Sequence, residues 1–328
     1  MKEKTLIIGL GGSGLRIAEM ISDKLSGEDR ENCIFMGFDS EDNGQKHRLQ
    51  KKLPVHTFLE NPKDDWFPLV PFPYDDGIDS RVGIRLSLNY SIYWGYLNDL
   101  TSILMDEQPQ RVILTGSFFG DAGSALIVPL SFYIRNTLKN PVHICGLFLL
   151  PEVFDPIFLS EREQEYARAK AYVVMRELHA YTADEAGLLK KKYRIRMALP
   201  RYQSRESDIC QGRPLDLCFL MDANAEQNAS MQETMESAAH FIRDLVHESF
   251  PDLEERLGAD GVCRFAVINS SRTMTACRKP VQIPLFAKNG PYEQAFYQYK
   301  YHVVSSNFDK YKHYHSHNSV DFPDLDES

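Results

Sequence analysis

The sequence lacks the short motifs that mark several common classes of protein. Its six cysteines are scattered and form no Cys-x-x-Cys pair, so the usual zinc-binding and thioredoxin-type patterns are absent. It contains no Gly-x-Ser-x-Gly nucleophile elbow and no Walker A lysine motif. No apolar run approaches the roughly 20 residues that a membrane-spanning helix requires. We therefore expect no membrane span, and we expect the cysteines to be buried, reduced thiols of a cytoplasmic protein.

Positive charge is also scarce. The chain has 37 Lys and Arg against 46 Asp and Glu, which gives a formal net charge of -9. A surface for nucleic acid needs clustered Lys and Arg to neutralise phosphates, so nucleic acid is not an expected partner. The N-terminal residues enter an apolar stretch directly, and we expect no signal peptide.

A glycine-rich turn joins a strand pattern to a helix pattern near the N-terminus. Residues 5–8 predict a buried strand, and residues 15–21 have helical apolar spacing. Such a turn presents bare backbone N–H groups at a helix N-terminus, where the helix dipole also favours an anion. Each glycine costs conformational entropy on folding, so this many glycines predict phosphate binding more than a plain turn. The residues of this first loop are Gly9, Gly11, Gly12, Ser13 and Gly14.

The same loop also matches a dinucleotide fingerprint. Taken literally, the pattern is Gly9-x-Gly11-x-x-Gly14, and Asp39 stands where a ribose-binding acid is expected. A protein that binds NAD or FAD is therefore one alternative. Asp39 also has a plainer interpretation, because an acid that ends a strand often caps the next turn.

Apolar strand patterns alternate with helical patterns along most of the chain. They recur at residues 32–39, 111–116, 141–151 and 214–222. This alternation predicts an α/β fold with three layers, in which a mostly parallel Rossmann-like sheet carries helices on both faces. Ligands of such sheets bind beyond the carboxyl ends of the strands, and both the first loop and a second loop of small residues follow strands.

The order of these pieces resembles the tubulin/FtsZ superfamily, most closely its bacterial tubulin-like branch, over roughly residues 4–275. In that family glycine-rich loops wrap the phosphates of GTP or GDP, and the signature loop Gly-Gly-Thr-Gly-Ser-Gly falls here on residues 120–125. The resemblance implies a guanine nucleotide with Mg²⁺, and a homo-oligomer or a tubulin-like or other protein as partner. Besides the first loop and Asp39, it assigns to the nucleotide a third loop with Gly77, Arg81 and Arg85, the signature-loop residues Gly120, Asp121, Ala122, Gly123 and Ser124, and Asn224 and Asn228 near the base.

The signature loop departs from the family pattern. Ala122 lacks the hydroxyl of the family's threonine, and Ala125 adds a Cβ atom where the family has glycine. Asp121 places a carboxylate close to phosphates, which is repulsive unless Mg²⁺ lies between them. Asp121 is therefore a candidate Mg²⁺ ligand.

The resemblance also implies a catalytic mechanism that needs two subunits. In the family, acids from one subunit polarise a water molecule against the γ-phosphate held by its neighbour. Asp252, Glu254 and Glu255 occupy the corresponding loop, without the family's Asn-x-Asp-x-x-Asp spacing. We expect GTP hydrolysis that is weak or depends on assembly. The alternative is a non-enzymatic interaction protein that kept the fold and partners another subunit.

We expect three parts along the chain. A tubulin/FtsZ-like nucleotide-binding domain covers residues 1–277, and a short C-terminal extension covers residues 278–312. The last part, residues 313–328, is a His-containing acidic tail that we expect to be disordered. The family's second domain, which contributes to protofilament contacts, has only residues after 277 as its counterpart here, so robust polymerisation is not expected.

Overall fold

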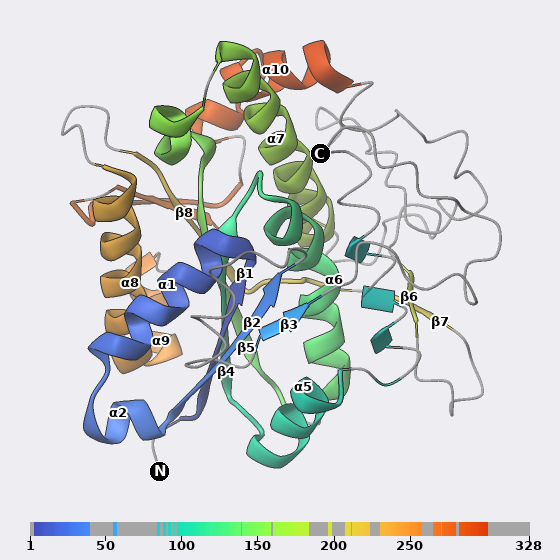
Figure 1. Ribbon diagram of the computed structural model, residues 1–328, viewed down its shortest axis with the longest axis vertical. Helices are drawn as coiled ribbons and strands as arrows, with labels where there is room; N and C mark the ends of the chain where they lie inside the picture. Colours follow the sequence, from blue (N-terminus) through green and yellow to red (C-terminus); the bar gives the residue numbers. More distant parts are fainter. Residues whose placement is uncertain are drawn as a thin grey trace.

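The structure is a computed structural model, shown in Figure 1. It describes residues 3–39, 55–57, 84–85, 88–89, 91–92, 95, 97–138, 140–158, 160–183, 196–198, 207–210, 212–223, 230–257, 265–269, 271–279 and 282–300.

Eight strands form one sheet in the order β10-β9-β8-β5-β4-β1-β2-β3. Every neighbouring pair in this sheet is parallel except β10 with β9. The predicted α/β fold with a mostly parallel Rossmann-like sheet is therefore confirmed. A separate antiparallel pair is formed by β6 and β7. The strands are β1 Thr5–Leu10, β2 Cys33–Asp39, β3 Val55–Thr57, β4 Arg111–Ser117, β5 His143–Leu149, β6 Arg196–Ala198, β7 Ser207–Ile209, β8 Leu217–Met221, β9 Phe265–Ile268 and β10 Met274–Cys277.

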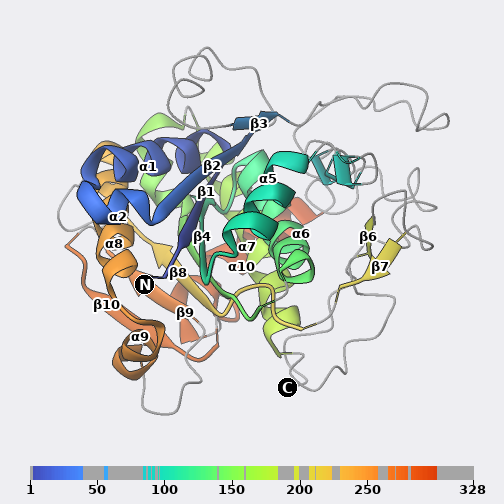
Figure 2. The ribbon, with the colours of Figure 1, turned by 90° about the horizontal axis from the view of Figure 1, so that it is seen from below.

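Helices cover both faces of the large sheet. Figures 1 and 2 show α1, α2, α8 and α9 on one face, and α5, α6 and α7 on the other. The α-helices are α1 Gly11–Lys24, α2 Gly27–Glu31, α5 Asn98–Ser102, α6 Asp121–Thr137, α7 Glu161–Ala183, α8 Met231–His247, α9 Phe250–Leu257 and α10 Pro291–Lys300. Shorter helical segments are the π-helix η1 Ile103–Glu107 and the 3-10 helices η2 Pro151–Ile157 and η5 Pro284–Phe286.

The core follows the two-residue alternation of side chains along a strand. Leu6 and Ile8 of β1 pack in the cluster that contains residues of α6 and α7. Ile7, between them, packs in the cluster that contains residues of α1 and α8. Because the inner strands β1, β4, β5 and β8 are buried on both faces, they are largely apolar, which is why the sequence predicted them well.

The strand order reverses between β1 and β4. β1 pairs with β2 on one side and with β4 on the other, and β4 continues the sheet toward β5. In open α/β sheets the crevice outside the carboxyl ends of the strands at this switch point is the usual place for a ligand. α1 follows β1 directly and α6 follows β4 after a short loop, so both glycine-containing loops lie at this point.

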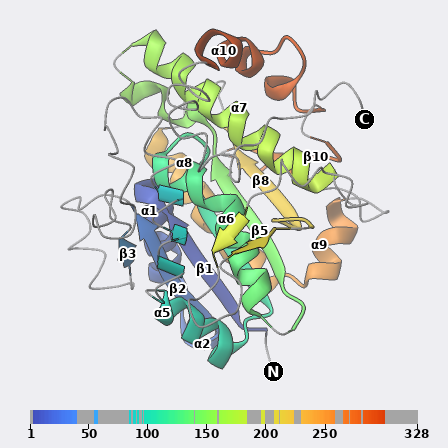
Figure 3. The same ribbon diagram turned by 90° about the vertical axis from the view of Figure 1, so that its right-hand side faces the viewer.

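The C-terminal part of the described chain packs on a helix. α10 lies against α7 (Figure 3), with Tyr292 buried completely and Tyr297 56% exposed. The hydroxyl of Tyr299 donates to Glu165 of α7 at 3.0 Å. In the part of the chain that the structure describes, no helix combines the length and the apolar character needed to cross a membrane.

Candidate functional site

The two glycine-containing loops touch at the switch point. A Cβ atom built on Gly11 would stand 3.6 Å from both the Cβ of Ala122 and the backbone nitrogen of Gly123. Gly11 has a φ of +68°, a left-handed conformation that favours glycine. The first turns of α1 and α6 therefore lie side by side, with the positive ends of both helix dipoles at the carboxyl ends of β1 and β4.

Three glycines of these loops allow the helices to start directly against the strands. A Cβ atom on Gly14 would overlap the backbone oxygen of Thr115 in β4. A Cβ atom on Gly9 would lie 2.6 Å from the backbone oxygen of Gly14, and one on Gly123 would lie 2.5 Å from that of Ser117. These positions need glycine for packing, whatever the loops bind.

Gly12 is different. Among the described residues, nothing lies within 4 Å of the position that its Cβ atom would take, and its φ is not in the left-handed region. Neither packing nor backbone conformation therefore explains a glycine here. An exposed glycine in the first turn of a helix costs stability relative to alanine, and it leaves the backbone open to close approach by a ligand.

The first turn of α6 carries a compensated negative charge. Oδ1 of Asp121 lies 2.5 Å from Nζ of Lys170 on α7. The hydroxyl of Ser117 accepts a hydrogen bond from the backbone N–H of Gly120 at 3.1 Å, and the hydroxyl of Ser124 donates to the backbone oxygen of Asp121 at 3.2 Å. The loop is thus held in place by its own side chains, and Lys170 offsets the repulsion that Asp121 would otherwise exert on an anion.

Two further residues assigned from the sequence are buried. Asp39 ends β2, next to the first loop, and is 8% exposed. Arg85 is 9% exposed, and its guanidinium is engaged inside the protein: Nε donates to the backbone oxygen of Ala125 at 2.9 Å, and Nη2 lies 2.6 Å from a carboxylate oxygen of Glu177 on α7.

A polar cluster that the sequence did not reveal lies past the ends of β5 and β8. Its members are Glu152, Asp155, Arg168, Asp222 and Tyr292. Arg168 donates from Nε to Glu152 at 3.1 Å and from Nη2 to Asp155 at 3.4 Å, and the Tyr292 hydroxyl donates to Glu152 at 2.5 Å. The only readable signal was an acid shortly after each buried strand, with Glu152 three residues after β5 and Asp222 one residue after β8.

The carboxylates of this cluster outnumber its cation. Burial raises the pKa of Asp222 to about 6, and the nearby charge of Glu152 adds to the effect. Burial also raises the pKa of Asp155, against the opposing influence of Arg168. Oδ1 of Asp222 is buried without a hydrogen-bond partner among the described residues. The cluster therefore holds one carboxyl that titrates near pH 6, at the same edge of the sheet as the two loops.

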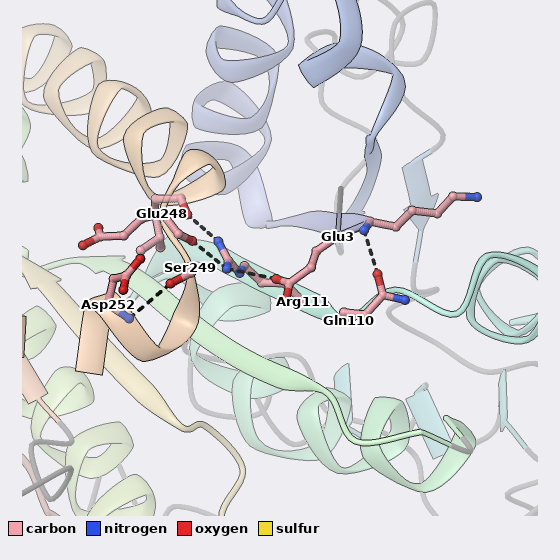
Figure 4. A network of polar contacts seen from close by, with 8 residues as sticks. Glu3, Gln110, Arg111, Glu248, Ser249 and Asp252 are labelled. Carbon is pink, nitrogen blue, oxygen red and sulfur yellow. Dashed lines mark hydrogen bonds and ion pairs between the residues drawn. The ribbon is translucent and has the colours of Figure 1, made fainter. Parts of the chain in front are cut away.

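The proposed catalytic acids lie at the other end of the molecule. Figure 4 shows Arg111, at the start of β4, donating to the backbone oxygens of Leu245 and Glu248 at the end of α8. The next residue, Ser249, immediately precedes α9, and its hydroxyl accepts from the backbone N–H of Asp252 at 3.2 Å. Asp252 and Glu255 are exposed there, at the amino ends of the strands. One copy of the chain therefore cannot bring these acids to its own glycine-containing loops.

Some assigned positions lie outside the described residues. These are Gly77, Arg81, Asn224 and Asn228, together with the side chain of Glu254, residues 301–312 of the predicted extension and the predicted tail, residues 313–328. The described residues include no group of three His, Cys, Asp or Glu side chains that could hold a metal ion.

One family model matches the chain. Residues 95–296, more than half of the chain, match a family model described as "Tubulin like". This match begins after the first glycine loop. A search of curated proteins returned no match.

Solved structures of tubulin-type proteins are also similar. TubZ of Clostridium botulinum phage c-st is 12% identical, with 76% of this chain and 61% of that chain covered and a TM-score of 0.43. CetZ2 from Haloferax volcanii, solved as a GTPγS-bound protofilament, is 15% identical. The match covers 80% of this chain and 64% of that chain, with a TM-score of 0.46. CetZ from Methanosaeta thermophila is 13% identical. The match covers 81% of this chain and 60% of that chain, with a TM-score of 0.44. The chain thus spans about three-fifths of the length of these structures.

Proposed function

Because the chain belongs to the tubulin-like family, we propose that it binds a guanine nucleotide, GTP or GDP, at the carboxyl ends of β1 and β4. The first loop, Gly9 to Gly14, holds phosphates through its backbone N–H groups. The signature loop, Gly120 to Ser124, closes over them from the other side. Asp39 lies at the edge of this site, beside the first loop.

The observation that supports the proposal most is the open space at Gly12. The other glycines of the two loops are explained by packing or by a positive φ, whereas Gly12 is not. It lies in the first turn of α1, next to the first turn of α6, where unpaired N–H groups of two helices converge. A phosphate group is the ligand that this arrangement of donors and dipoles favours.

Magnesium fits this site as a partner of the phosphates. Asp121 is the only acid in the first turn of α1 or α6, and its carboxylate is paired with Lys170. A Mg²⁺ ion would therefore take its ligands mainly from phosphate oxygens and water, which is its usual mode of binding with nucleotides. Its charge would offset that of the phosphates.

Hydrolysis, on this proposal, requires two copies of the chain. Asp252 and Glu255 stand at the amino ends of the strands, and the phosphate loops stand at the carboxyl ends. A head-to-tail contact would place the acids of one copy against the nucleotide of the next. We expect Asp252→Asn combined with Glu255→Gln to leave GTP affinity unchanged and to lower phosphate release by at least tenfold at concentrations where the protein assembles. Unchanged release would exclude these acids from the reaction.

A second candidate is a non-enzymatic partner for another subunit. The departure of the signature loop from the family pattern, with Asp121 paired to Lys170, favours this role over efficient hydrolysis. The five cysteines in the described residues are buried and form no disulfide with one another, which supports a reducing compartment such as the cytoplasm.

Isothermal titration with GTP, GDP, ATP and NAD, each with and without Mg²⁺, tests the proposed function. Micromolar binding of GTP or GDP without binding of NAD is the expected result. Binding of NAD alone would support the dinucleotide alternative. Binding of no nucleotide would contradict the proposal and leave the partner role.

A further inference from the structure

Helix α6 contains a proline that removes one of its own hydrogen bonds. Pro129 lies inside α6 and has no backbone N–H. In an α-helix the N–H of residue 129 would donate to the backbone oxygen of Ala125, four residues earlier. Ala125 is completely buried, so this oxygen cannot be satisfied by bulk water.

Arg85 supplies the missing donor. Its Nε donates to the backbone oxygen of Ala125 at 2.9 Å. The same guanidinium is held by Glu177, whose side chain is 2% exposed, at 2.6 Å. Arg85 thus joins three elements: the segment around residues 84–92, the second turn of α6, and α7.

The turn of α6 that Arg85 completes is the one that follows the signature loop. Asp121 to Ser124 form the first turn, and the bond that Pro129 removes would have linked the next residue to the body of the helix. The joint between the first turn and the rest of α6 therefore has one helix hydrogen bond fewer, and contacts from outside the helix contribute to its orientation. Arg85 provides one of these contacts, and the close approach of Gly123 to Ser117 provides another.

We propose that Arg85 is a positioning residue, which sets the first turn of α6 through Ala125 and is not itself a phosphate ligand. This inference rests on the proposed nucleotide site. A lysine at position 85 would keep the charge pair with Glu177. It would not also donate from the position of Nε, because lysine lacks the planar fork of guanidinium donors.

A cycle of Arg85→Lys and Pro129→Ala tests the proposal. Pro129→Ala restores the N–H at position 129, so the backbone oxygen of Ala125 regains a partner within the helix. We expect Arg85→Lys to speed hydrogen exchange in a peptide covering residues 117–127 and to weaken GDP binding about tenfold, the scale of one buried hydrogen bond. In the double variant, we expect Pro129→Ala to recover most of both losses, while alone it changes either by less than about twofold.

The outcomes separate this proposal from the proposed function. If the wild-type protein binds no nucleotide but the exchange rates show the rescue, the nucleotide site is wrong and the role of Arg85 in α6 stands. If GDP binds and Arg85→Lys weakens it without rescue by Pro129→Ala, Arg85 acts on the ligand directly and the proposal fails. It also fails if Arg85→Lys changes neither exchange nor affinity. Arg85→Met with Glu177→Met, which leaves no buried unpaired charge, should behave as Arg85→Lys does and be rescued in the same way.

Discussion

Lys170 of α7 pairs with Asp121 in the first turn of α6, with Nζ and Oδ1 2.5 Å apart. The side chains are 13% and 37% exposed, respectively, so the pair is only partly screened by solvent. It places a lysine beside the loop that we propose closes over the phosphates, and it neutralises the one acid there. The signature loop can therefore differ from the family pattern without repelling an anion.

The first prediction concerns this pair. Lys170→Met leaves the Asp121 carboxylate uncompensated near the phosphates, and we expect GDP affinity to fall about tenfold. Asp121→Asn removes the acid, frees Lys170, and should leave affinity equal or higher. Titration of both variants and of the double variant, with and without Mg²⁺, measures the effect. A loss of Mg²⁺ dependence in Asp121→Asn would instead make this carboxylate a metal ligand.

The second prediction compares two glycines of the first loop. Gly14→Ala puts a Cβ atom onto the backbone of Thr115, and we expect it to lower the free energy of unfolding by about 2–4 kcal/mol. Gly12→Val enters open space, so urea unfolding should change little, whereas nucleotide binding should be lost because the side chain occupies the place of the phosphates. If Gly12→Val binds GDP as the wild type does, the first loop does not hold the phosphates.

The third prediction concerns the pH dependence of stability. The pKa of Asp222 is about 6 in the folded protein, above the ordinary value of 3.8 for this carboxyl. A carboxyl whose pKa is raised on folding destabilises the folded state where it is ionised, so the cost is fully present above about pH 6 and vanishes below about pH 4. At 1.36 kcal/mol per pKa unit, the cost is at most about 3 kcal/mol.

We therefore expect Asp222→Asn to raise the free energy of unfolding by about 1–3 kcal/mol at pH 7.5 and to leave it unchanged near pH 4. Urea unfolding across this range measures the difference. Glu152→Gln, which removes a neighbouring charge, should shift the same curve in the same direction by a smaller amount. A difference between Asp222→Asn and the wild type that is the same at every pH would show that titration of this carboxyl is not its cause.

The fourth prediction tests whether a contact at the amino ends of the strands affects nucleotide binding at the carboxyl ends. Arg111 is 2% exposed and donates to the last carbonyl groups of α8 (Figure 4). Arg111→Met removes the guanidinium that joins the start of β4 to the end of α8, and we expect a loss of about 2–4 kcal/mol in the free energy of unfolding. Because the contact lies at the amino ends of the strands, GDP affinity of the folded variant should stay within about twofold of the wild type. A large loss of GDP affinity would contradict the prediction, because it would show that the amino and carboxyl ends of the sheet are energetically coupled.

The sequence predicted the sheet and the closeness of the two loops, because both depend on local patterns. Strands buried on both faces are continuous apolar runs, as in β1 and β4, and the carboxyl ends of parallel strands share an edge. The two loops that follow these strands were therefore expected to lie near one another, and Gly11 and Ala122 do.

Tertiary pairings could not be predicted in this way. The contact of Asp121 with Lys170 spans 49 positions, and nothing local to either residue indicates it. The sequence assigned Arg85 to a phosphate because of its place in the chain. In the structure its Nε donates to the backbone oxygen of Ala125, 40 positions away, which no local pattern indicates. The proline four residues after Ala125 was a readable signal, since it predicts a buried carbonyl in need of a donor from elsewhere.

Hydrogen exchange with and without saturating GDP both detects the ligand and locates it between the two loops or elsewhere. We expect slower exchange in peptides that cover residues 5–16 and 117–127, and no change in the peptide that covers α9. Binding of GDP that leaves both loop peptides unchanged would contradict a site between the first turns of α1 and α6.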